Sequence, residues 1–166
     1  MSFKIITISR EFGSGGRFIG EQIAQKCGIE FYDKKIIEHV AKELGISEQI
    51  VANQGEYAPA GSIFSYAFVG RDITGVSLSD QIFNIQQKLI KDIAQKEPCV
   101  IVGRCADYIL SDRDDVLNVF IHGDMPEKVQ RICKLYNVAE VDAAKMITET
   151  DKRRRTNYNF YTDQKW

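Results

Sequence analysis

The chain has 166 residues, the usual size of one domain, so it can bury a sizeable core without disulfides or metal staples. Its 22 Lys and Arg residues nearly balance its 23 Asp and Glu residues, and the net charge of -1 gives no general reason to expect a nucleic acid or an anionic membrane as partner. The four cysteines include no CxxC pair and only two histidines occur, so the composition indicates neither a zinc cluster nor a disulfide framework.

The N-terminal part of the chain has the pattern of a strand, a glycine-rich loop and a helix. The β-branched run over residues 4–9 predicts a buried strand, and Gly13-Ser14-Gly15-Gly16 follows closely. Apolar residues then recur at helical spacing until Gly28, which is expected to end the helix. Residues 1–4 lead directly into the strand, and no apolar run approaches the roughly 20 residues of a membrane-spanning helix. We therefore expect a cytoplasmic protein with no membrane partner.

The next part of the chain predicts a second short strand over residues 29–32 and a helix that ends at Gly45. Residues 52–77 are rich in Gly, Ser, Ala and aromatic residues without a clean period, which is typical of an irregular or mobile segment. Ser79 or Asp80 is expected to cap a long helix that follows this segment.

Two continuous apolar runs, over residues 99–102 and 116–122, predict strands with helices between them. This alternation indicates an α/β fold with a parallel sheet that is covered on both faces. Asp124 and Pro126 are expected to begin the helix that follows the second run. The helical pattern over residues 140–155 ends in the basic run 152–155.

The glycine loop predicts a phosphate-binding site. A strand that turns through such a loop into a helix presents unpaired backbone N–H groups at the positive end of the helix dipole. Ser14 can add a hydroxyl donor, and Arg17 places a cation in the first helical turn. No lysine follows the glycines, so Arg17 or Arg10 is a candidate for the missing charge. The alternatives are a tight turn without a ligand and an Arg17 side chain that points to solvent.

Two further basic sites support phosphate binding. Arg104 follows the most apolar strand and is expected at the carboxyl end of the sheet, where ligands bind in open α/β folds. A buried guanidinium there needs an anion, or an acid such as Asp107 or Asp33. The run over residues 153–155 is either a ligand clamp or a solvated helix face. Three basic sites in one small domain, each suited to an anionic partner, favour phosphate binding.

With these motifs in view, the sequence resembles the cytidylate kinase-like family of P-loop nucleoside monophosphate kinases. The resemblance rests on four segments that follow the family's order, over residues 8–16, 31–33, 98–107 and 151–155. It implies a single P-loop kinase domain, a three-layer α/β/α structure with a parallel five-stranded sheet. Its core would span residues 1–51 and 78–137, with an acceptor-binding insertion over about 52–77 and an arginine lid over about 148–163.

The resemblance also implies roles for single residues. The donor ATP, with Mg²⁺, would be held by the loop and its flanks, namely Arg10, Gly13, Ser14, Gly15, Gly16 and Arg17. The acceptor would be bound by Asp33, Lys34, Arg71, Arg104 and Asp107. Catalysis would use Arg17, Arg104, Arg153 and Arg155, of which the last two would act from the lid. No residue is assigned as a metal ligand.

Three features differ from the family pattern: the loop lacks its lysine, Cys105 stands where an aspartate reads cytosine, and the chain stops at Trp166 before a last strand and helix. We expect either further residues after Trp166 or a sheet with one strand fewer. The expected function is phosphoryl transfer from ATP to a nucleoside monophosphate, CMP or dCMP. The alternatives are a nucleotide sensor without catalysis and a kinase for another small phosphate-bearing acceptor.

Overall fold

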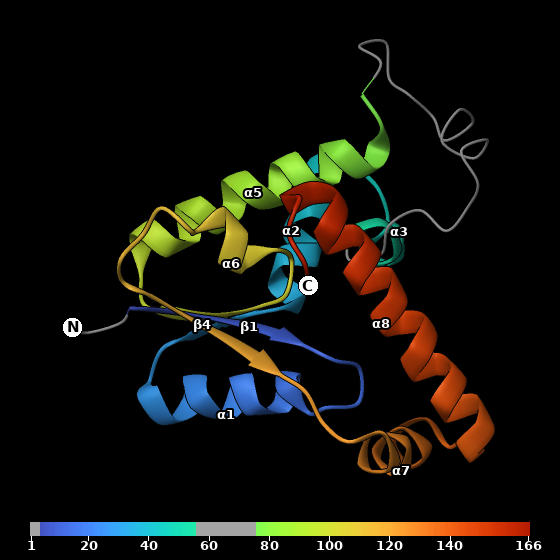
Figure 1. Cartoon of the computed structure of the whole chain (residues 1–166). Helices are drawn as coiled ribbons and strands as arrows, with labels where there is room; N and C mark the ends of the chain where they lie inside the picture. Colours follow the sequence, from blue (N-terminus) through green and yellow to red (C-terminus); the bar gives the residue numbers. More distant parts are fainter. Residues whose placement is uncertain (1–3, 56–75) are drawn as a thin grey trace.

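The computed structural model of the chain describes residues 4–55 and 76–166. Most of the expected insertion, including Arg71, lies outside the described residues. The described part of the chain alternates strands and helices as the sequence predicts, and Figure 1 shows their arrangement.

The sheet is parallel and has four strands in the order β2-β3-β1-β4. Its strands, in chain order, are β1 (Ile5–Arg10), β2 (Glu30–Tyr32), β3 (Cys99–Val102) and β4 (Val116–Ile121). The five strands implied by the family resemblance are therefore not found among the described residues, which form four. Because β1 is central and lies between β3 and β4, its carboxyl end is flanked by the ends of both neighbours.

Helices cover both faces of the sheet, so the structure has three layers (Figure 1). One face is covered by α1 (Gly16–Cys27). The opposite layer contains α2 (Lys34–Leu44), α3 (Glu48–Gly55), α5 (Leu78–Lys96) and the short α6 (Ala106–Ile109). The chain then continues through α7 (Met125–Tyr136) into the long α8 (Glu140–Thr162), which runs from α7 to α5. The ring of Tyr161 on α8 stacks on Phe83 of α5 with the centroids 4.0 Å apart.

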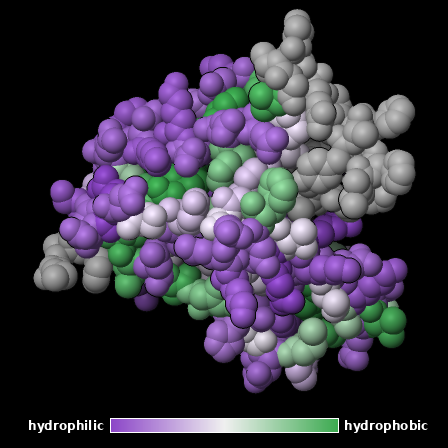
Figure 2. Space-filling model, turned by 45° about the horizontal axis from the view of Figure 1, so that its top comes forward, coloured by the Kyte–Doolittle hydropathy of each residue, from purple (hydrophilic) through white to green (hydrophobic). Residues whose placement is uncertain are grey.

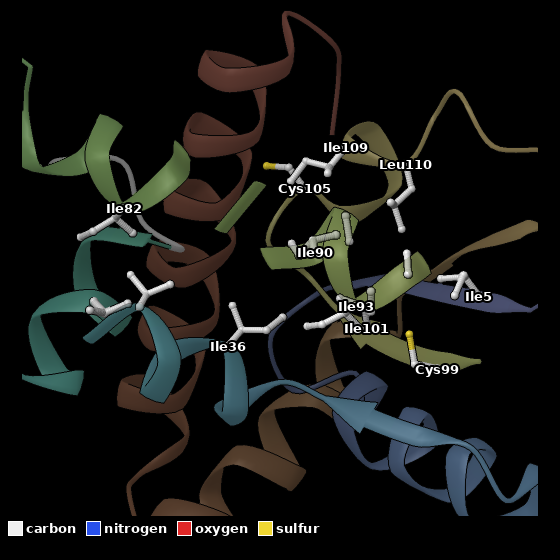
Figure 3. Close-up of a cluster of buried hydrophobic side chains, with 14 of the residues drawn as sticks. Ile5, Ile36, Ile82, Ile90, Ile93, Cys99, Ile101, Cys105, Ile109 and Leu110 are labelled. Atoms are coloured by element: carbon white, nitrogen blue, oxygen red, sulfur yellow. The ribbon is translucent and has the colours of Figure 1, made fainter. Parts of the chain in front are cut away.

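The continuous apolar run of β3 is explained by burial on both sides of the strand. Val100 and Val102 pack with Ile8 of β1 on the α1 side. Cys99 and Ile101 face the larger core of the other layer, which Figure 3 shows in close-up. Since no position of β3 meets solvent, the strand has no polar alternation.

Several predicted helix ends are confirmed, and one cap is corrected. Gly28 and Gly45 end α1 and α2 in the left-handed conformation, with φ of 64° and 65°. The cap of α5, however, is Ser77, whose hydroxyl accepts a hydrogen bond from the Asp80 amide at 3.2 Å. The prediction of Ser79 or Asp80 as the cap was wrong because Ser79 lies inside the first turn and is buried.

Two predicted boundaries also move. α3 continues to residue 55, so the helical part of the chain extends into the segment that was expected to be irregular from residue 52 onward. α8 continues beyond the basic run to Thr162. The segment expected as a lid is therefore part of one uninterrupted helix.

The visible face of the molecule is mostly hydrophilic, with apolar side chains in small separate patches (Figure 2). Among residues 4–55 and 76–166, no helix combines the length and the apolar character that crossing a membrane requires.

Close packing of α1 on the sheet can be tested at Gly20. A Cβ atom at this buried position would lie 2.9 Å from Ile8 Cδ1 and 3.3 Å from Val102 Cγ2. We expect Gly20→Val to lower the free energy of unfolding by about 1–3 kcal/mol through overpacking, measured by urea denaturation. Glu21→Val, at the exposed neighbouring position, controls for helix propensity and should cost less than about 1 kcal/mol. Equal losses in the two variants would contradict this account of the packing.

Candidate active site

The loop between β1 and α1 has the backbone conformation of a phosphate cradle. Gly13 and Gly15 adopt positive φ values of 81° and 86°, a region that side chains disfavour. A Cβ atom at Gly13 would also lie only 3.1 Å from Lys128 Cβ, because α7 packs directly against the loop. Conformation and packing therefore both require glycine at this position.

The loop leaves backbone donors available for an anion. The amides of Gly13, Gly15, Arg17 and Phe18 donate no hydrogen bond to any of the described residues. Ser14 is used differently from the prediction, because its hydroxyl donates to the Glu11 carbonyl at 2.8 Å and accepts from the Gly16 amide at 3.3 Å. Ser14 thus holds the shape of the loop, which leaves the amides and the positive end of the α1 dipole available for an anion.

Arg17 and Asp33 are brought together because both follow the carboxyl end of a strand of the parallel sheet, β1 and β2 respectively. Arg17 Nε lies 2.8 Å from Asp33 Oδ2, and the Arg17 side chain is 65% exposed. Lys34, the next predicted acceptor residue, turns away from this pair and lies 3.3 Å from Glu38 and 3.7 Å from Glu48. Arg17 is therefore at the loop but directed toward Asp33.

A cation that sequence reasoning missed approaches the loop from α7. Arg131 donates from Nη1 to the Gly13 carbonyl, and its guanidinium lies 3.5 Å from the position of a Cβ at Gly15. One helical turn earlier, Lys128 approaches the same loop. The only sequence signal for this pair was the spacing of two basic residues on one face of the helix that begins after Asp124.

Lys128 is the centre of a buried charge cluster that joins three elements. Its ammonium group lies 2.8 Å from Glu11 Oε2 and 3.7 Å from Asp151 Oδ2, and the residue is only 5% exposed. Asp151 of α8 also accepts a hydrogen bond from the Phe12 amide at 2.7 Å. The loop, α7 and α8 are thus fastened to one another by hydrogen-bonded charges.

The pKa values of the two carboxylates move in opposite directions. Burial raises the pKa of Asp151, against the lowering effects of the Phe12 amide, Arg154 and Lys128. Burial alone would also raise the pKa of Glu11, but the hydrogen bonds from Lys128 and the Gly123 amide bring it below its ordinary value. Glu11 is therefore the carboxylate that these contacts favour in its charged form.

Three arginines meet beside the loop, in a group that we call the arginine corner: Arg10, Arg104 and Arg154. With Asn157 and other residues they line a cavity of about 20 Å³, which is large enough for a water molecule. Arg154 donates from Nη1 to the Arg10 carbonyl at 3.2 Å. The absence of a side chain at Gly103 leaves room for the Arg10 guanidinium, which a Cβ there would overlap. Three guanidinium groups in one place favour an anionic ligand.

The backbone that presents Arg104 is strained. Gly103, Arg104 and Cys105 have consecutive positive φ values of 69°, 59° and 54°. For residues with a side chain this conformation costs of order 1–2 kcal/mol each. The turn directs Arg104 into the buried corner, where the residue is only 4% exposed. The predicted place of Arg104, at the carboxyl end of β3, is confirmed.

The basic run of α8 contributes one arginine to the corner. Arg154 lines the small cavity, while Arg153 and Arg155 lie on the exposed side of the helix. This follows from helical geometry, because neighbouring residues point about 100° apart. The structure thus leaves Arg153 and Arg155 outside the arginine corner and brings Arg154 into it.

Asp107, a predicted acceptor residue, lies in a neighbouring cavity of about 150 Å³. Its Oδ2 accepts a hydrogen bond from the Tyr158 hydroxyl at 2.7 Å, and burial together with this bond raises the pKa of Tyr158. The two cavities share Ser9, Tyr158 and Trp166. Asp107 is therefore close to the arginine corner, on the side of β4.

Within residues 4–55 and 76–166, no three His, Cys, Asp or Glu side chains gather as they would around a metal ion.

A profile of the cytidylate kinase-like family matches residues 5–166. A search of curated proteins gave no match. Among solved structures, an uncharacterized protein from Eubacterium ventriosum ATCC 27560 is 32% identical with a TM-score of 0.72, over 98% of this chain and 80% of that chain.

Two shikimate kinases are more distant. The enzyme from Acinetobacter baumannii, solved in complex with shikimate, is 13% identical with a TM-score of 0.51, over 95% of this chain and 79% of that chain. The enzyme from Bacteroides thetaiotaomicron is 16% identical with a TM-score of 0.53, over 94% and 81%. These two likenesses show that the chain shares their fold.

The charge cluster can be tested at Asp151. We expect Asp151→Ala to lower the free energy of unfolding by about 1–3 kcal/mol, because it removes a buried acceptor from the Phe12 amide and from Lys128. Chemical denaturation of the variant and wild type measures this change. Glu149→Ala, at an exposed position two residues earlier on α8, is the control and should change stability by less than about 0.5 kcal/mol. Asp151→Ala with wild-type stability would show that the cluster does not hold the three elements together.

Proposed function

Because the chain belongs to the cytidylate kinase-like family, we propose that it transfers the γ-phosphoryl group of ATP to a nucleoside monophosphate, CMP or dCMP, in the cytoplasm. The observation that carries this proposal is that the glycine loop and the arginine corner lie side by side at the carboxyl ends of β1 and β3. A donor phosphate on the loop and an acceptor phosphate in the corner would face each other there.

On the donor side, the phosphates of ATP bind the loop amides, and Mg²⁺ bound to these phosphates would neutralise part of their charge. The loop lacks the usual lysine, so a cation must follow the β- and γ-phosphates through the reaction. Arg17 and Arg10 were the candidates from the sequence. The contacts at Gly13 and Gly15 favour Arg131 for this role, while Arg17 is engaged by Asp33.

On the acceptor side, Arg104 binds the acceptor phosphate, with Asp33, Lys34 and Asp107 around the acceptor and Arg71 beyond the described residues. An oxygen of that phosphate attacks the γ-phosphorus, the bond to the β–γ bridging oxygen breaks, and ADP leaves. The acceptor oxygen is already ionised, so no protein base is needed. The arginines neutralise the charge that spreads over the transferring group. Arg153 and Arg155 contribute only if this part of α8 moves relative to the loop.

A second candidate function is supported by the missing lysine. A chain that binds a nucleotide without transferring its phosphate would act as a sensor, and its output would be a change of conformation. A kinase for a different small phosphate-bearing acceptor is the third possibility. Both share the donor site with our proposal, so binding of ATP alone does not distinguish them.

Acceptor choice is tested by a coupled ADP-release assay with MgATP and a panel of nucleoside monophosphates and other small phosphate-bearing acceptors. We expect CMP or dCMP to give the highest kcat/KM. Selectivity over other nucleotides should be modest, because Cys105 cannot supply the carboxylate that pairs with the cytosine amino group. Turnover of another acceptor with CMP and dCMP inert would refute this acceptor, and no turnover of any acceptor would favour the sensor.

The replacement for the lysine is tested by Arg131→Ala and the matched Arg17→Ala. We expect Arg131→Ala to weaken ATP binding by about 1.5–3 kcal/mol, the worth of a charge-assisted hydrogen bond, and to lower turnover as well. Arg17→Ala should have a clearly smaller effect on ATP, since its contact is with Asp33. Calorimetric ATP titration compares the two variants. If Arg17→Ala loses more ATP affinity than Arg131→Ala does, Arg17 and not Arg131 replaces the lysine.

A further inference from the structure

Gln86 of α5 is a buried polar residue that the fold does not account for. It is 1% exposed, and neither its amide nitrogen nor its amide oxygen has a hydrogen-bond partner among the described residues. Buried side-chain amides are normally hydrogen-bonded, because burial without a partner is unfavourable. An apolar side chain of similar size would serve the core better. The presence of an amide here therefore points to a ligand that uses it.

The position of Gln86 along α5 places it beside the proposed acceptor site. Only Glu97 and Pro98 separate α5 from β3, so the helix runs back along the strand in the opposite direction. Gln86 lies ten residues before the helix end, which is about 15 Å along the axis. The four residues of β3 span about 13 Å, so Gln86 is level with the end of the strand and with Arg104.

The face of α5 that carries Gln86 also points toward the strained turn. Ile82 and Ile90, one helical turn before and after Gln86, belong to the same buried cluster as Cys105 and Ile36. Figure 3 shows these side chains gathered in one core between α5, α2 and the Cys105 turn. Because residues four apart share a helix face, Gln86 is directed into this core as well.

We infer that Gln86 binds the nucleobase of the acceptor whose phosphate is held by Arg104. This inference rests on the proposed function, which supplies the pyrimidine base, because an amide alone pairs equally well with N1 and N6–H of adenine. The amide presents an N–H donor and a carbonyl acceptor in one plane, and cytosine presents the complementary N3 acceptor and N4–H donor side by side. Sugar phosphates and sugar alcohols have no such planar pair. Gln86 is covered in this structure, so the base reaches it when the elements around α5 move apart.

The chemistry of an amide also sets the expected selectivity. An amide can rotate by half a turn, after which it donates to O4 of uracil and accepts from its N3–H. Gln86 therefore binds both pyrimidines, whereas the carboxylate that Cys105 replaces would select cytosine. We expect CMP and UMP to bind with affinities within about tenfold of each other, and both to bind much more tightly than ribose 5-phosphate.

The test is calorimetric titration of the full chain with CMP, UMP and ribose 5-phosphate, in wild type and Gln86→Met. Gln86→Met should lower the affinity for CMP and UMP by roughly ten- to hundredfold, the discrimination of a good bidentate pair. It should leave ribose 5-phosphate unchanged, because that probe has no base. Gln87→Met, at the neighbouring and less buried position, is the matched control and should leave all three affinities unchanged. The melting temperature of Gln86→Met should be equal or higher, since the substitution removes an amide without partners.

Other outcomes are decisive too. Wild-type affinity of Gln86→Met for CMP and UMP, or failure of wild type to bind either of them, would overturn the inference. If Gln86→Met does not fold, Gln86→Asn keeps the amide but withdraws it by one methylene, and unchanged CMP affinity in that variant would also overturn it. If wild type binds CMP more tightly than Gln86→Met does but releases no ADP, the kinase proposal is refuted and the assignment of Gln86 to the base stands. If Gln86→Met turns over CMP as well as wild type does, the kinase proposal stands and the assignment of Gln86 to the base is wrong.

Discussion

The hydrogen bond from the Phe12 amide to Asp151 is the contact on which the site depends most. It connects the glycine loop to α8 across a sequence separation of 139 residues, and buried Lys128 binds the same carboxylate from α7. Arg154 follows Asp151 by three residues on α8, so the contact that fixes Asp151 also places Arg154 at the Arg10 carbonyl. The loop alone would be a short, glycine-rich turn with little to fix its shape. With α7 and α8 attached, the loop has a fixed shape, so its amides are preorganised for the phosphates of the proposed donor.

This arrangement concentrates positive charge where the sheet ends. Arg10, Arg104 and Arg154 come from β1, the turn after β3 and α8, and the chain accepts backbone strain at Arg104 and Cys105 to assemble them. Such strain persists only where the surrounding structure enforces it. The clustered cations and the strained turn are both unfavourable for stability and both favourable for binding an anion. A transferring phosphoryl group with charge on its oxygens is the ligand that such a site suits best.

The elements of the fold could be predicted from local pattern, but much of the site could not. The β1 strand, the glycine loop and the place of Arg104 follow from short-range periodicity and from the rule that ligands bind at strand carboxyl ends. Arg131, Lys128 and Asp151 act through contacts with a loop more than 100 residues away, and no spacing in the sequence indicates such pairs. Gln86 lies in a stretch that reads as an ordinary amphipathic helix, and only its burial without partners distinguishes it.

The central claim is that the glycine loop and the arginine corner are two halves of one site. The most direct test is the affinity of a bisubstrate ligand in which adenosine and cytidine are joined through five phosphates, measured by calorimetry against ATP and CMP. If the two halves face each other, the second contact becomes intramolecular, and the bisubstrate should bind at least about a hundredfold more tightly than ATP. Affinity no better than that of ATP would show that the two anion sites are not joined in one active site.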